Sequence, residues 1–176
     1  MPIPRADLQV ETTAFGIPLM EWHQADLANM GITGTSGDHF VSLSTEDILM
    51  KGNTPSSSTV TDISRVQFTL PPSYVGGTDL TFRVTAVVDV VDDANQIDLS
   101  VYRVTSTSGA VGSDICATAI QTTTATATAY DFTITGATLE PGTIINLKMT
   151  TVNTDANGSN GIVTIGYTAL LMQTRG

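Results

Sequence analysis

The sequence predicts an all-β protein, an antiparallel β-sandwich of the jelly-roll type with about eight strands and an extended N-terminal arm. The first observation is strict alternation of apolar and polar residues, which is typical of a half-buried strand. It is clearest in residues 80–90, where every second residue is apolar. The second observation is that the alternation recurs between turn sequences, in residues 66–70, 130–134, 145–149 and 163–171.

Turn residues divide the chain into its expected strands. Pro71 and Pro72 interrupt a central strand, Asp92 to Asn95 suit a tight hairpin, and Pro141-Gly142 presets a turn. The resulting strands are residues 38–44, 60–70, 79–91, 96–106, 114–121, 129–136, 143–153 and 161–173. In the last of these, one face is expected to carry Val163, Ile165, Tyr167, Ala169 and Leu171.

Threonine is abundant, with 30 residues, and all seven residues at positions 122–128 are Thr or Ala. A β-branched residue with a hydroxyl suits the solvated face of a strand. The run also fits a loop, because it contains no large apolar residue. The sequence leaves both interpretations open.

Residues 1–37 differ from the rest, because prolines and glycines are frequent and no period is sustained. We expect this segment to be an arm, with a short helix within residues 19–30 that ends before Gly31. The sandwich domain is then residues 38–176. Apolar side chains on such an arm need a surface to cover them, either the protein's own sandwich or a neighbouring subunit. The expected contact residues are Phe15, Ile17, Leu19, Met20 and Trp22.

Charge and composition exclude several functions. Seven Lys and Arg against 17 Asp and Glu give a net charge of −10, so nucleic acid is not an expected partner. The single cysteine, Cys116, rules out a disulfide within the chain. No stretch is apolar over the roughly 18 residues of a membrane span, and the N-terminus has no secretion signal pattern. We expect a soluble protein without a membrane partner.

No arrangement of catalytic residues stands out. Two histidines, His23 and His39, are the only bases available to a nucleophile such as Cys116, and no nucleophile motif surrounds that cysteine. The same three residues lack the spacing of zinc ligands. Acidic residues expected at the surface, such as Asp62, Asp79 and Asp131, give no facing pair for glycoside hydrolysis. We therefore expect a protein that is not an enzyme and has no cofactor.

The sequence also contains a candidate cation loop and a candidate sugar-binding residue. Asp92, Asp93 and Asn95 place oxygen ligands at short spacing, which suits a loop calcium ion, although such residues are also ordinary in hairpins. Tyr74, in the Pro-Pro loop, is the one aromatic residue expected to be exposed as a sugar-stacking platform. Tyr102, Tyr130 and Tyr167 lie at strand positions, where packing is the commoner use.

Two phrases, FTLPPSYVGGTDL at residues 68–80 and LEPGTIINL at residues 139–147, carry a resemblance to known proteins. Over residues 60–172 the chain resembles jelly-roll virion proteins of tailed bacteriophages, especially head decoration (cement) proteins. The resemblance implies a homotrimer that binds the major capsid protein on the outside of the head and stabilises it. It implies no catalytic residues, and it implies a protein made in the host cytoplasm and located on the virion. A fibre, spike or receptor-binding module on the same fold, or a carbohydrate-binding module, is the alternative.

Overall fold

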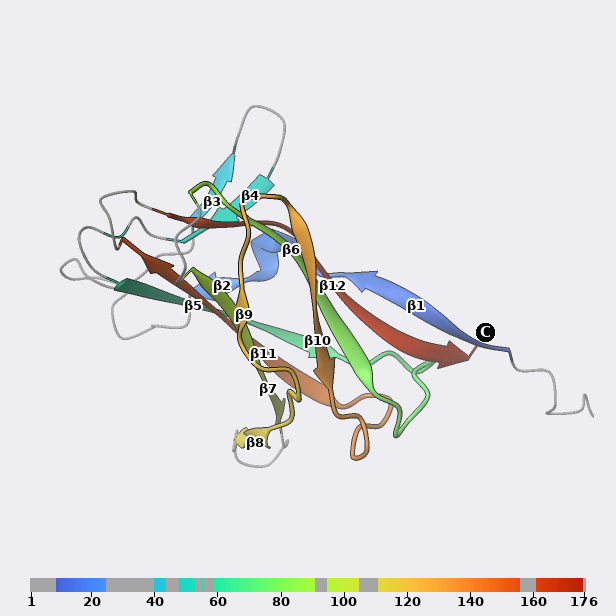
Figure 1. Cartoon of the computed structure of the whole chain (residues 1–176). Helices are drawn as coiled ribbons and strands as arrows, with labels where there is room; N and C mark the ends of the chain where they lie inside the picture. Colours follow the sequence, from blue (N-terminus) through green and yellow to red (C-terminus); the bar gives the residue numbers. More distant parts are fainter. Residues whose placement is uncertain are drawn as a thin grey trace, which may run out of the picture.

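The alternating segments pair into two antiparallel sheets that pack face to face as a sandwich (Figure 1). The computed structural model describes residues 9–24, 40–43, 48–52, 55, 59–90, 95–104, 111–155 and 161–175. Sheet A contains β1 (Val10–Gly16), β3 (Phe40–Leu43), β4 (Ile48–Lys51), β6 (Leu80–Val88), β10 (Thr128–Ile134) and β12 (Val163–Arg175). Sheet B contains β2 (His23–Gln24), β5 (Thr59–Thr69), β7 (Gln96–Val104), β8 (Val111–Asp114), β9 (Gln121–Thr122) and β11 (Ile144–Thr154).

The strand pairs confirm the jelly roll. Four antiparallel pairs are nested in the sequence, each inside the one before: β4 with β12, β5 with β11, β6 with β10, and β7 with β8. The chain thus pairs like one long hairpin rolled into two sheets, with β12 between β4 and β6, and β11 between β5 and β7. This is the double Greek key of a jelly roll, and the all-β sandwich expected from the alternation is confirmed.

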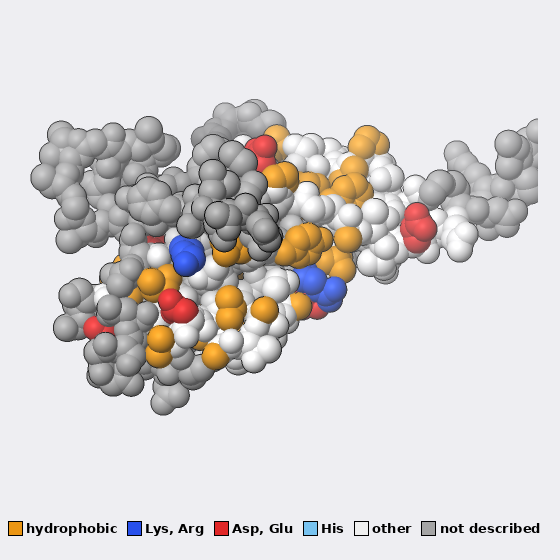
Figure 2. Space-filling model, turned by 90° about the horizontal axis from the view of Figure 1, so that it is seen from above, with side chains coloured by type: hydrophobic (Ala, Val, Ile, Leu, Met, Phe, Trp, Pro, Cys, Tyr) orange, Lys and Arg blue, Asp and Glu red, His pale blue; other side chains and the backbone are white. Residues whose placement is uncertain are grey.

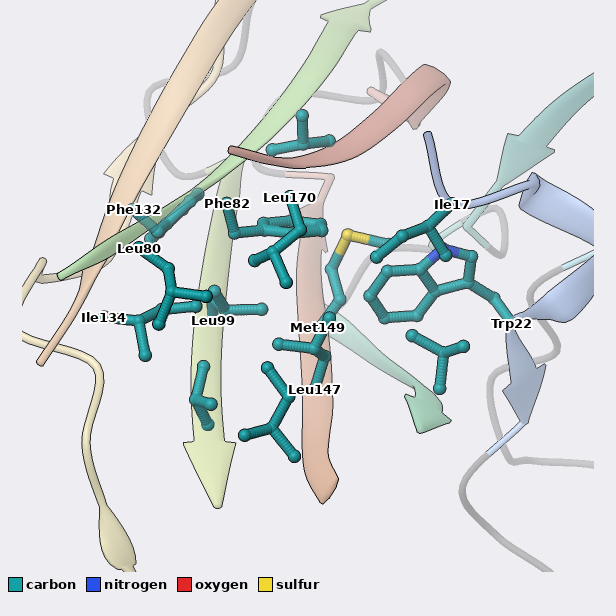
Figure 3. Packing of buried hydrophobic residues seen from close by; sticks show 14 of the residues in the cluster. Ile17, Trp22, Leu80, Phe82, Leu99, Phe132, Ile134, Leu147, Met149 and Leu170 are labelled. Carbon is teal, nitrogen blue, oxygen red and sulfur yellow. The ribbon is translucent and has the colours of Figure 1, made fainter. Parts of the chain in front are cut away.

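One hydrophobic core fills the space between the sheets (Figure 3). The inward residues of β6 and β11 alternate strictly with half-exposed ones, as the sequence pattern predicts. Phe82, Phe132 and Leu147 are fully buried. Because the sandwich is closed by apolar side chains from both sheets, the outward faces and the loops are left to carry any function.

The predicted strands match the observed ones to within a few residues, with two differences. The first expected strand, 38–44, is observed as β3 and is followed by a second short strand, β4. The fifth, 114–121, is replaced by β8 and β9 on either side of it. The Thr-rich run begins in β9, passes through bends at residues 125–126 and enters β10, so it is loop in its middle and strand at its ends.

Within the segment expected to be an arm, residues 10–24 pair with both sheets of the sandwich, whereas residues 1–8 and 25–37 lie outside the described part of the chain. β1 pairs with β12 from Gly16↔Ala169 to Val10↔Arg175, and β2 pairs with β5 in the other sheet. Between them, Leu19–Glu21 form one 3-10 turn in place of the predicted start of a helix. We call residues 10–24 the N-terminal strap, because they join the edge of sheet A to the edge of sheet B (Figure 1).

The two phrases that carry the resemblance meet at one end of the sandwich. The Leu70 N–H donates to the Thr143 carbonyl at 2.9 Å, and the Gly142 N–H donates to the Leu70 carbonyl at 2.9 Å. The Gly77 N–H donates to the Leu139 carbonyl, also at 2.9 Å. Two loops that are far apart in sequence therefore form one hydrogen-bonded end, which we call the loop clasp (residues 70–79 and 135–143). Among the residues described, no helix is long and apolar enough to cross a membrane.

Candidate functional site

The residues expected to contact a partner lie mostly inside this chain's own core. Ile17, Leu19 and Trp22 are each less than 10% exposed and belong to the hydrophobic cluster, where Figure 3 shows Trp22 next to Ile17. The Trp22 indole packs edge-on against Phe82, with ring centroids 5.7 Å apart. The expectation that these three side chains face a partner is therefore wrong for this fold, because the strap already buries them.

Of the other two expected contact residues, only Phe15 has a described side chain. Phe15 is half-buried, and its ring packs against Phe68 of the opposite sheet with centroids 6.3 Å apart. The side chain of Met20 is outside the described part of the chain. None of the five residues therefore presents a demonstrated free apolar surface.

Hydrogen bonds to Thr168 hold the strap in place. The Trp22 Nε1 donates to Thr168 Oγ1 at 3.1 Å, and that hydroxyl donates to the Ile17 carbonyl at 2.6 Å. The Ile17 N–H donates to the Thr168 carbonyl at 2.9 Å. Each buried polar group of this junction has a partner, as a stable interior requires. Thr168 is therefore the anchor of the strap on β12.

Tyr74 is not an exposed platform, which corrects the expectation for the Pro-Pro loop. It is 2% exposed, and its hydroxyl donates to the Thr78 carbonyl within the loop clasp. Its backbone lies against Thr174 of β12. Burial raises the pKa of the Tyr74 phenol above its ordinary value, because desolvation disfavours the phenolate. The ring anchors the clasp to the core and is not available for a sugar.

The expected cation loop is described only at Asn95, because Asp92 and Asp93 lie outside the described residues. Asn95 is fully buried, and its Oδ1 accepts a hydrogen bond from the Thr154 N–H at 2.8 Å. Its carbonyl accepts hydrogen bonds from the N–H and hydroxyl of Thr123. Among the described residues, no group of three His, Cys, Asp or Glu side chains is placed to hold a metal ion. Asn95 therefore ties three loops together and has a structural role.

The remaining candidate groups are dispersed. Burial raises the pKa of the Cys116 thiol, which makes the nucleophilic thiolate scarcer. Of the two histidines suggested as bases, His39 lies outside the described residues and only the backbone of His23 is described. Asp62 was expected at the surface but is fully buried, where it accepts a hydrogen bond from Asn153 Nδ2 at 3.0 Å. Asp79 accepts a hydrogen bond from the Gly136 N–H in the loop clasp.

A bulge in β12 changes which face its residues occupy. Ile165 pairs with Ala86, but Tyr167 pairs with Thr85, so Gly166 is an extra residue in the register with β6. Before it, Val163 and Ile165 point into the core, and after it Thr168, Leu170 and Met172 do so. Tyr167 is therefore turned outward and is 46% exposed, which corrects the single apolar face expected from the alternation.

Tyr167 stands on the outer face of sheet A beside a charged pair. Arg83 lies two residues along β6 from Thr85, the partner of Tyr167, so it is diagonal to Tyr167 and directly opposite Asp131 of β10. The guanidinium binds the carboxylate through two hydrogen bonds, Nε to Oδ1 at 2.7 Å and Nη2 to Oδ2 at 2.6 Å. These hydrogen bonds lower the pKa of the Asp131 carboxyl and raise the pKa of Arg83. We call Tyr167, Arg83 and Asp131 the outer platform.

An open groove of about 380 Å³ runs along the other side of Tyr167. It is lined by Gly16, Ile17, Pro18, Leu19, Gly166, Tyr167 and Thr168. A Cβ atom added at Gly16 would meet nothing within 4 Å, so the groove is open above this glycine. Figure 2 shows hydrophobic side chains gathered close to charged ones on the face seen from above.

The sequence alone does not indicate the outer platform, because a tyrosine at a strand position, such as Tyr167, is more often packed than exposed. One signal was present: a glycine inside a strand pattern, here Gly166, often marks a bulge that redirects its neighbours.

Comparison with known proteins gives no family. No protein-family model and no curated protein matches the chain. One similar solved structure is that of TmCBM61, a carbohydrate-binding module, in complex with β-1,4-galactotriose. Its TM-score is 0.45 at 12% identity, and the alignment covers 92% of this chain and 88% of that one. A likeness this distant carries no argument about the ligand or function of this chain.

Proposed function

We propose that this protein is a non-enzymatic structural protein of a tailed-bacteriophage virion, a decoration (cement) protein on the outer surface of the head. The observation that carries the proposal is the loop clasp. The two phrases that resemble decoration proteins are joined there by backbone hydrogen bonds, at one end of a jelly roll, a fold that viral capsid domains use widely. The two phrases that carry the resemblance therefore belong to one structural unit of the fold.

Charge supports a position on the outside of the shell. A net charge of −10 on 176 residues keeps free copies apart in solution and is repelled by packaged DNA. A shell protein also gains from repetition, because weak contacts by each copy, and by each subunit of a trimer, add up over the lattice. No catalytic group is needed for this role.

The capsid contact in this proposal differs from the one expected from sequence. Ile17, Leu19 and Trp22 are used to close the sandwich, so the surfaces left for the major capsid protein are loops and exposed faces. The loop clasp offers a rigid end of this kind, because Gly136 packs so closely on the Thr78 carbonyl that a Cβ there would lie 1.7 Å from it.

The test is the copy number of this protein in purified virus particles, measured by quantitative mass spectrometry against the major capsid protein. A number comparable to the shell subunit supports the cement role. A small fraction of that number moves the protein to a fibre, spike or vertex. Absence from the particle overturns the virion proposal.

A second test asks for binding directly. Purified protein is added to heads that lack it, and sedimentation separates bound from free protein. Saturable binding that raises the temperature at which the heads release DNA is the expected result. Heads that bind the protein without any gain in stability would contradict cementing.

A further inference from the structure

We propose that the outer platform and its groove form a binding site for a neutral carbohydrate, with a pyranose ring stacked on Tyr167. This inference does not depend on the virion role, because it rests on the geometry of β12, β6, β10 and the N-terminal strap. It also replaces Tyr74, which the sequence suggested for this purpose and which the fold buries.

The first argument is the exposed ring with small neighbours. Tyr167 is one of the few large apolar side chains left exposed in the described chain. Next to it on the same face, the register places Ala169 on β12 and Gly16 on β1. Ala169 is covered and only 1% exposed, whereas Gly16 has no side chain and open space lies above it, so the ring is open to a flat ligand on its Gly16 side. The C–H face of a pyranose is such a ligand, since aromatic side chains combine apolar contact area with a polar edge.

The second argument is the polar pair at the edge of the ring. The Arg83 and Asp131 side chains are 42% and 44% exposed, so both reach solvent. Arg83 has five N–H donors, and two of them are used on Asp131. The others remain for ligand oxygens, and the carboxylate keeps lone pairs that accept from hydroxyl groups. Adjacent donors and acceptors fixed by a bidentate pair are complementary to the vicinal hydroxyls of a sugar.

The third argument concerns charge. The Arg83 and Asp131 charges offset each other locally, and the whole chain carries −10. An anionic sugar is therefore disfavoured by the field of the protein, whereas a neutral one is not. The groove on the far side of Tyr167 extends the site along the edge of β12, so that an oligosaccharide gains contacts with the exposed Gly16 and Pro18 that a single sugar lacks.

The experiment is a titration of ¹⁵N-labelled full-length protein, followed by NMR chemical shifts. The probes are neutral tetrasaccharides of glucose, galactose, mannose and N-acetylglucosamine, and an oligogalacturonate as the anionic comparison. We expect saturable shifts at β12 and β6 with at least one neutral probe at concentrations up to about 10 mM, the range of weak sites. The anionic probe should give none.

Three variants make the test specific. Tyr167→Ala should weaken binding at least tenfold, and Tyr167→Phe should retain most of it because the stacking face remains. Gly16→Val should weaken binding by filling the groove, and the open space above Gly16 means that the fold accommodates it. Ile144→Ala removes another exposed apolar side chain, 38% exposed and on β11 of the opposite sheet, and should leave binding unchanged.

Several outcomes would overturn the inference. These are no saturable binding to any neutral probe, binding only to the anionic probe, or equal binding by wild type and Tyr167→Ala. If no sugar binds and Tyr167→Ala lowers the oligomeric mass in sedimentation, the face is a subunit interface and the carbohydrate site is wrong.

Discussion

Two adjacent residues of β12, Tyr167 and Thr168 just after the bulge, have opposite roles. Thr168 points inward, where it is 1% exposed and anchors the strap through Ile17 and Trp22. Tyr167, the residue before it, points outward and stands beside a groove. Neighbouring residues of a strand point to opposite faces, and the extra residue Gly166 decides that Thr168 is the inward one and Tyr167 the outward one. In one strand, therefore, a residue can stabilise the fold while its neighbour on the other face is free for binding.

The strap and the outer platform also differ in how they are held. The strap is fixed by core packing and buried hydrogen bonds, so its removal should affect folding. The platform is held by sheet register and an exposed ion pair, so its removal should affect binding while the fold stays intact. Substitutions in the strap should therefore lower stability, and substitutions in the platform should lower binding alone.

The largest expected effect is at the strap. Trp22→Ala removes a buried indole that packs on Phe82, and we expect it to lower the free energy of unfolding by about 3–5 kcal/mol. Urea unfolding followed by circular dichroism measures it. Tyr167→Ala is the matched control on the outer side and should change stability by less than about 0.5 kcal/mol. If Trp22→Ala and Tyr167→Ala lowered the free energy of unfolding equally, the strap and the platform would not differ in the way the structure indicates.

Two glycine substitutions compare the loop clasp with the open surface above Gly16. Gly136→Ala forces a Cβ against the Thr78 backbone, and we expect a loss of about 2–3 kcal/mol. Gly16→Val, where a Cβ meets nothing, should cost less than about 0.5 kcal/mol. Thermal melting of both variants tests this. A Gly136→Ala protein as stable as wild type would show that the clasp is not closed in solution.

The anchor itself should show an intermediate effect. Thr168→Val keeps the side-chain shape but leaves the Trp22 indole N–H without its acceptor and the Ile17 carbonyl without its hydroxyl donor. We expect a loss of about 1–2 kcal/mol in urea unfolding. In the Trp22→Phe background the same change should have a smaller effect, because the indole N–H is gone. Full additivity of the two changes would argue against the hydrogen bond.

The smallest expected effect is the pH dependence of the outer platform. Arg83 holds the pKa of the Asp131 carboxyl below its ordinary value of about 3.9. The pair therefore contributes stability above that pH, and the contribution is lost as the pH falls through the lowered pKa of the folded state. NMR titration of the Asp131 carboxyl carbon should give a midpoint below that of an unstructured Asp. An ordinary midpoint, unchanged in Arg83→Gln, would mean that the pair does not form in solution.

Much of the fold could be predicted from sequence because alternation reports burial directly. Residues 80–88 and 145–149 alternate as observed, and Val163 and Ile165 point inward as expected. The prediction failed beyond Gly166, because periodicity cannot register an extra residue unless the glycine is interpreted as a bulge. It also failed for the strap: β1 is an edge strand in which only Thr13 and Phe15 are half-buried, so no apolar period appears.

The candidate site was less predictable, since exposure depends on contacts distant in sequence. Tyr74 was expected to be exposed because prolines precede it, but residues 135–143 and β12 close over it. The Arg83 and Asp131 pair depends on the register of β6 with β10, which alternation alone does not fix. Local sequence therefore indicated the strands, and the pairing of those strands determined the site.

Tyrosine modification of the native protein tests the central claim, that the bulge turns Tyr167 outward, most directly. Limited iodination followed by peptide mass spectrometry ranks the reactivity of Tyr74, Tyr102, Tyr130 and Tyr167 in one experiment. The structure predicts that Tyr167 reacts first and that the buried Tyr74 and Tyr130 react only on unfolding. A native protein in which Tyr74 reacts before Tyr167 would contradict both the bulge and the outer platform.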